Sequence, residues 1–171
     1  ILYFAGWVIM TWFLRSLSLK EDKTGGLTYF HKSEFYSRIY IFFLAVTFSL
    51  ACFDLIMSID PHWYSTISAF KHFASFFYHG SAVILLITVI LNKMGHFTFF
   101  NRNHLQDMSS YVFMLSIIYG YLWFAQFMLI WYGNIPEETI YYAVRWEGQW
   151  QILFWADIII NWFIPFAVLM P

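Results

Sequence analysis

The chain alternates between long apolar runs and shorter polar stretches. Apolar runs cover residues 39–58, 65–91, 110–131 and 151–170, and a shorter one covers 1–14. About 20 apolar residues span the hydrocarbon core of a bilayer as a helix, and lipid requires each spanning segment to satisfy its own backbone hydrogen bonds. We therefore expect an all-α, polytopic transmembrane helix bundle with about five spans. Because the first run is short, we expect 1–171 to be a single bundle fragment, part of a larger bundle.

The polar stretches predict how the spans are connected. Residues 15–38 and 92–109 are rich in charged and small polar side chains, which is typical of solvated loops. Pro61 cannot continue a helix and predicts a tight turn after the second span. The stretch from 134 to 150 predicts a break followed by a short interfacial helix. Pro165 predicts a kink in the last span.

The distribution of Lys and Arg predicts the orientation of the spans. Residues 15–38 contain five of these cations and 92–109 contain two, whereas the turn at Asp60 contains none and 134–150 contains only Arg145. Cytoplasmic loops carry the excess of Lys and Arg. We therefore expect the loops 15–38 and 92–109 to be cytoplasmic.

Composition supports a membrane protein and excludes several other classes. Hydrophobic residues make up 61% of the chain and charged residues 11%, against about 45–50% and about 25% in soluble domains. The net charge of −1 provides no basic field for nucleic acid. Cys52 is the single cysteine, so this chain cannot by itself hold an iron–sulfur cluster or attach a c-type haem.

Ionisable residues within the apolar runs are the candidate functional groups. Ionisable side chains in the hydrocarbon region face a partner or water, and they mark ion or proton paths. Ser68, His72, Ser75 and His79 are spaced to lie on one face of the third span. Asp54, near the outer end of the second span, is expected at the depth of Lys71 and His72. That pairing predicts either a structural ion pair or the outer end of a proton route, which Tyr64 would extend.

A second group of candidates is expected near the middle of the bundle. Asp157 lies at mid-span, and Asn161 follows it one helical turn later. With His79 at similar depth, the alternatives are proton transfer between His79 and Asp157, a static hydrogen bond, or contact with a quinone. Ser116, Tyr119, Trp123 and Gln126 share a face of the fourth span. Tyr119 and Gln126 are therefore candidate proton relays, although such aromatic stripes often serve packing.

The histidine positions argue against a cofactor or metal in this chain. A b-type haem needs axial histidines on facing helices, but His72 and His79, the only histidines within the spans, share one face of one helix. No set of histidines and carboxylates has the spacing of metal ligands. We expect no catalytic residue, bound cofactor or metal within the chain.

Two long segments resemble a known family. SIDPHWYST at 58–66 and YLWFAQFMLIWYGNIPEE at 121–138, together with HLQD at 104–107, are similar to signature segments of the NrfD-like (polysulfide reductase membrane subunit) family. The resemblance covers about residues 40–170 and is closest to the ActF-type branch found in bacterial alternative complex III. It implies a multi-pass subunit of the bacterial inner (cytoplasmic) membrane.

The resemblance also implies a function and a set of partners. It implies a quinol:cytochrome c or electron-acceptor oxidoreductase in which this subunit holds no redox centre and supplies a transmembrane proton path. Quinone or menaquinone, iron–sulfur clusters and c-type haems would lie in partner subunits: a second NrfD-like subunit, an iron–sulfur protein and multihaem cytochromes c. Two alternatives stay open. One is a purely structural membrane anchor, and the other, ranked lowest, is an ion-coupled transporter.

Overall fold

A computed structural model describes residues 2–60, 62–97 and 100–170 of the chain. Those residues form helices joined by turns, without strands, which confirms the all-α prediction. Five helical segments are long and apolar enough to cross a membrane: Leu2–Thr24, Leu27–Ile59, Thr66–Lys93, Arg102–Gly133 and Trp150–Leu169. The predicted turn residue Pro61 lies outside the described residues.

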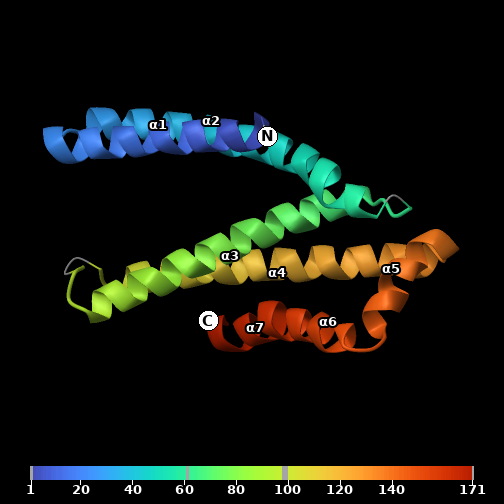
Figure 1. Ribbon diagram of the computed structural model, residues 1–171. Coiled ribbons are helices and arrows are strands. Elements are labelled where there is room, and N and C mark those ends of the chain that lie inside the picture. The colour runs from blue at the N-terminus through green and yellow to red at the C-terminus, as the bar shows by residue number, and fades with distance from the viewer. Residues whose placement is uncertain (1, 61, 98–99, 171) are drawn as a thin grey trace. The chain divides into compact units, whose positions relative to one another are not determined.

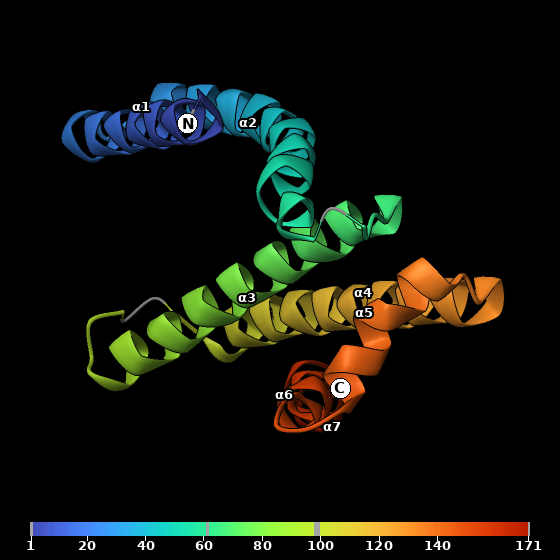
Figure 2. The same ribbon diagram turned by 45° about the vertical axis from the view of Figure 1, so that its right-hand side comes forward.

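The chain divides into two compact units, Ile1–Ile59 and Asp60–Pro171. The first unit is a helical hairpin of α1 (Leu2–Thr24) and α2 (Leu27–Leu55), followed by the short η1 (Met57–Ile59). The two long helices run side by side (Figures 1 and 2). Trp7 donates its indole N–H to Thr47 Oγ1 across the hairpin at 2.8 Å.

The turn of this hairpin differs from the sequence prediction. Residues 15–38 were expected to form a solvated loop, which is wrong, because α1 continues through Thr24 and α2 begins at Leu27. Lys and Glu have helix propensities close to that of Ala, so a charged segment can extend an apolar helix beyond lipid. Gly25, at φ 66°, provides the left-handed conformation that reverses the chain.

The second unit is built around α4. It contains α3 (Thr66–Lys93), α4 (Arg102–Gly133), α5 (Pro136–Trp146), α6 (Trp150–Ile158), η2 (Ile159–Phe163) and α7 (Ile164–Leu169). Helix α3 packs along α4, and η2 and α7 pack against α4 as well (Figure 1). The core between α3 and α4 includes Tyr78, Val112 and Leu115.

Local signals set the ends of α4 and α5. The side chain of Asn101 accepts hydrogen bonds from the backbone N–H groups of Asn103 and His104, which caps α4. The predicted loop 92–109 is therefore too long, since residues from 102 onward are helical. Asn134 ends α4 in the left-handed region, and Pro136 begins α5. The predicted short helix in 134–150 is thus present.

The last span contains a π-helical turn. In η2 the N–H of Ile164 donates to the carbonyl of Ile159, five residues earlier. The turn lies directly before Pro165, the residue predicted to kink the helix, whose missing N–H already interrupts the helical ladder. Such turns occur frequently at functional sites, and this one contains Asn161.

Candidate functional site

A chain of polar contacts links four elements of the second unit, α3, α4, α6 and η2. The carboxylate of Asp157 on α6 accepts a hydrogen bond from the hydroxyl of Tyr119 at 2.8 Å. Its other oxygen accepts one from Nδ2 of Asn161 at 2.7 Å. Oδ1 of Asn161 lies 3.0 Å from Nε2 of His79 on α3. Asn161 therefore bridges a carboxylate and an imidazole that were expected to interact directly.

A close approach between η2 and α4 holds Asn161 in place. Trp162 follows Asn161, and its indole lies directly over Gly120 of α4. A Cβ atom at position 120 would be only 2.4 Å from Trp162 Cδ1. Only glycine lets the indole approach the α4 backbone this closely, so Gly120 positions the turn that carries Asn161.

The second nitrogen of His79 is occupied within its own helix. Nδ1 lies 2.7 Å from the carbonyl oxygen of Ser75 and 3.2 Å from the Ser75 hydroxyl. His72 repeats this geometry one heptad earlier, at 2.7 Å from the Ser68 carbonyl and 3.3 Å from its hydroxyl. The predicted stripe of serines and histidines is therefore formed by two equal local motifs, each a serine four residues before a histidine.

A small polar cavity of about 210 Å³ opens beside Asp157. Lys71 from α3 and Arg145 from α5 line it together with Asp157. A water molecule occupies about 30 Å³ in the liquid, so the cavity has room for several. Both cations and the carboxylate of Asp157 thus border one space that can be hydrated.

The sequence prediction did not include Arg145 among the site residues. Its guanidinium lies 3.4 Å from the ring centroid of Tyr141 and donates to the Tyr141 carbonyl at 2.6 Å. The Tyr141 ring in turn stacks on Trp63, with centroids 4.2 Å apart. The available sequence signal was that Arg145 is the single cation in the stretch 134–150.

Two tyrosines of α5 line the same cavity as neutral groups. Burial raises the pKa of the Tyr141 phenol above its usual value, while the nearby Arg145 opposes this increase. Burial also raises the pKa of Tyr142. Both phenols therefore remain protonated at neutral pH.

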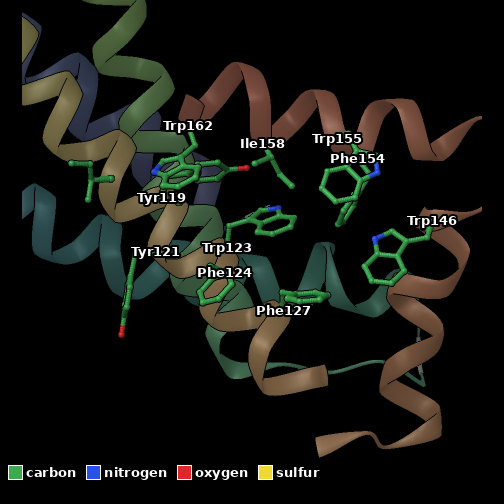
Figure 3. Close-up of a pocket in the computed structure, with 12 residues that line it drawn as sticks. Tyr119, Tyr121, Trp123, Phe124, Phe127, Trp146, Phe154, Trp155, Ile158 and Trp162 are labelled. Carbon is green, nitrogen blue, oxygen red and sulfur yellow. The ribbon is translucent and has the colours of Figure 1, made fainter. Parts of the chain in front are cut away.

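An aromatic cavity of about 560 Å³ adjoins the polar one (Figure 3). The two cavities share Trp123 and Phe154 in their walls. Figure 3 shows Tyr119 and Trp162 at one end of the aromatic cavity and Trp146 at the other. Tyr119, which lines the aromatic cavity, donates its hydroxyl to Asp157, which lines the polar one.

The structure places four of the predicted site residues in one network: His79, Tyr119, Asp157 and Asn161. Lys71 joins them through the polar cavity. Gln126 is 0% exposed, and neither of its amide atoms has a hydrogen-bonding partner among the described residues. No hydrogen bond among the described residues supports its predicted role as a relay.

The remaining predicted residues lie apart from this network. Tyr64 is 69% exposed. His72 bonds to Ser68, one turn earlier on its own helix. Asp54, in the first unit, accepts a hydrogen bond from Tyr3 at 2.8 Å. The expected pairing of Asp54 with Lys71 or His72 joins different units and stays a prediction.

The described residues contain no group of three or more His, Cys, Asp or Glu side chains that could hold a metal ion. The chemistry that the network can perform is proton exchange, because it joins an imidazole, an amide, a carboxyl and a phenol. The sequence matches no protein-family model and no curated protein at a significant level.

Proposed function

We propose that this chain is a non-redox membrane subunit of a quinol-oxidising complex of the alternative complex III type, and that it supplies part of a transmembrane proton path. The observation that carries the proposal is the network of His79, Asn161, Asp157 and Tyr119 within apolar helices. The resemblance of residues 58–66 and 121–138 to the NrfD-like family supports the setting. The partners would be a second NrfD-like subunit, an iron–sulfur protein and multihaem cytochromes c.

Asp157 is the group that exchanges protons with solvent in this proposal. It borders the cavity that Lys71 and Arg145 also line, and its carboxylate oxygens accept from Tyr119 and Asn161. Asp157 thus joins the cavity that can be hydrated to the hydrogen-bonded network.

His79 provides the next position on the path. Its Nε2 meets Asn161, and its ring is exposed on the surface of the second unit. An imidazole is the side chain whose ordinary pKa lies closest to neutrality. A proton that reaches Asp157 from the cavity can therefore be passed, by way of Asn161, to His79 on α3.

A static anchor is the alternative that the same contacts favour. Every oxygen of Asp157 has a donor, and a half-buried carboxylate with good partners can serve only to join helices. The anchor and the proton path predict different results when the charge of Asp157 is removed while its shape is kept.

The test is quinol oxidation and proton translocation in the reconstituted native complex. We expect Asp157→Asn and His79→Gln to abolish translocation while electron transfer continues, and Asp54→Asn tests whether the first unit belongs to the path. Thr88→Val is the matched control, since the Thr88 hydroxyl donates to the Ile84 carbonyl of its own helix. Unchanged translocation in all three variants, with the complex assembled, would instead establish the anchor.

The setting is tested separately from the path. Isolation of the full-length protein from its native membrane should bring with it c-type haem, detected by its optical spectrum, and iron–sulfur clusters, detected by electron paramagnetic resonance. Isolation of an intact membrane protein without haem or cluster would contradict the respiratory assignment.

A further inference from the structure

The side chain of Asn161 lies between an acid and a base, and an amide is not symmetric. Its oxygen only accepts hydrogen bonds, and its NH₂ group only donates them. Asn161 points one end at His79 Nε2, at 3.0 Å, and the other at Asp157, at 2.7 Å. Which end faces which neighbour must therefore match the protonation of both. We refer to His79, Asn161 and Asp157 as the trio.

The other nitrogen of His79 fixes one proton. Nδ1 lies 2.7 Å from the Ser75 carbonyl oxygen, which can only accept. The Ser75 hydroxyl is farther away, at 3.2 Å. Nδ1 therefore carries a hydrogen, and only Nε2 can change between protonated and free.

With Oδ1 of Asn161 toward His79, as in the structure, the trio is in a charged state. Nε2 must carry a hydrogen to donate to Oδ1, so His79 is an imidazolium. Nδ2 donates to Asp157, which is then a carboxylate. Tyr119 also donates to Asp157 and supports this state.

With the amide turned over, the same trio is in a neutral state. NH₂ then faces Nε2, which must be a free acceptor, and the amide oxygen faces Asp157, which must carry a hydrogen to donate. Between the two states one N–H bond at His79 Nε2 breaks and one O–H bond at Asp157 forms. The number of protons in the trio and its summed charge of zero are unchanged.

We propose that Asn161 is a proton-coupled switch, whose amide turns over whenever a proton changes place between His79 and Asp157. The proposal rests on the proposed proton path and names Asn161 as its positioning residue. The surroundings favour opposite states. Desolvation by lipid favours the neutral state, whereas the Tyr119 hydroxyl and the cations at the cavity, Lys71 and Arg145, favour the carboxylate of the charged state.

The test is infrared difference spectroscopy of the full-length protein in its native complex as the temperature is changed at constant pH, because two states with the same number of protons are not shifted against each other by pH. Asp157→Asn identifies the carboxylic acid band of Asp157, and isotope-labelled histidine with His79→Gln identifies the imidazolium bands of His79. The bands of the neighbouring groups Tyr119, Tyr141 and Lys71 are separated by their own positions. In the wild type we expect the acid band of Asp157 to grow as the imidazolium band of His79 falls, in a fixed proportion.

Asn161→Leu removes the amide and keeps the volume, and it should make the two bands change independently of each other. It should also lower proton translocation by about tenfold or more, the scale of a lost acid–base step, with quinol oxidation retained. If Asn161→Leu does not assemble, the smaller Asn161→Ala also lacks the amide, adds no titratable group and should separate the bands as well. Independent bands in the wild type, or an unchanged proportion in these variants, would overturn the switch.

The results distinguish the switch from the path itself. Normal translocation in Asn161→Leu, with loss in Asp157→Asn and His79→Gln, would overturn the switch and leave the proposed path in place. Normal translocation in Asp157→Asn and His79→Gln would remove the path. The proportion of the two bands would then still decide whether Asn161 couples His79 to Asp157.

Discussion

His72 and His79 lie on one face of the same helix and differ in what reaches their second nitrogen. Both place Nδ1 2.7 Å from the carbonyl of the serine four residues earlier. His79 also meets Asn161 through Nε2, whereas no hydrogen bond reaches His72 Nε2 from the described part of the second unit. The local motif thus gives both histidines the same contact at Nδ1. The packing of η2 adds a second contact, at Nε2, to His79 alone among the described residues of the second unit.

The largest expected difference is between substitutions of the two histidines. His79→Gln should abolish proton translocation in the reconstituted complex, because Nε2 is one end of the switch. His72→Gln should lower it by much less, about twofold, because the contacts of His72 in the second unit stay within one helix. Equal losses in both variants would show that the path follows the stripe rather than the trio.

Gly120→Ala should separate the two histidines without altering either. The added methyl group would lie 2.4 Å from Trp162 Cδ1, so Trp162 and the neighbouring Asn161 must shift. We expect a loss of about 1–3 kcal/mol in stability and altered imidazole signals for His79 but not for His72, measured by thermal unfolding and nitrogen NMR.

Gly80→Ala is the matched control for Gly120→Ala. Position 80 follows His79 directly, yet an added Cβ would meet no described atom within 4 Å. An alanine there should leave the His79 signals unchanged and stabilise α3 by about 0.5–1 kcal/mol. A similar disturbance in both variants would mean that Trp162 does not hold the trio.

Tyr119→Phe should shift the balance within the trio while keeping its geometry. It removes the 2.8 Å hydrogen bond to the Asp157 carboxylate, and hydrogen bonds to charged groups contribute about 1.5–3 kcal/mol. The neutral state should therefore gain population, seen as a stronger acid band of Asp157 in the infrared spectrum. A weaker acid band would contradict the assigned direction of this hydrogen bond.

The smallest effects are expected from the serine hydroxyls. Ser75→Ala and Ser68→Ala remove hydroxyls at 3.2 and 3.3 Å from the imidazole nitrogens but keep the carbonyls at 2.7 Å. Each should lower stability by about 0.5–1.5 kcal/mol, the net contribution of one hydrogen bond, measured by thermal unfolding, and leave translocation close to the wild-type rate. A large loss in Ser75→Ala alone would make its hydroxyl, rather than its carbonyl, the partner that fixes the tautomer.

Gln126 shows where sequence patterns and packing differ. It shares a helical face with Tyr119, so the sequence could not rank the two residues as relays. Their burial in the structure does not distinguish them either, because both side chains are buried. The structure gives Tyr119 a carboxylate partner, while the amide of Gln126 meets none among the described residues. A partner on another helix is a property of packing, which the spacing within one helix does not contain.

The sequence by itself determined the spans, their helical form and the local serine–histidine motifs, because hydrophobic length and the i, i+4 geometry of a helix act within one segment. It also placed His79, Asp157, Asn161 and Tyr119 at similar depth. Only the tertiary structure decided that Asn161 would bridge His79 and Asp157, and that Arg145 would share a cavity with Lys71. Those contacts depend on the π-helical turn and on the approach of Trp162 to Gly120. The sequence does not determine how one helix is rotated against another, so it could not predict them.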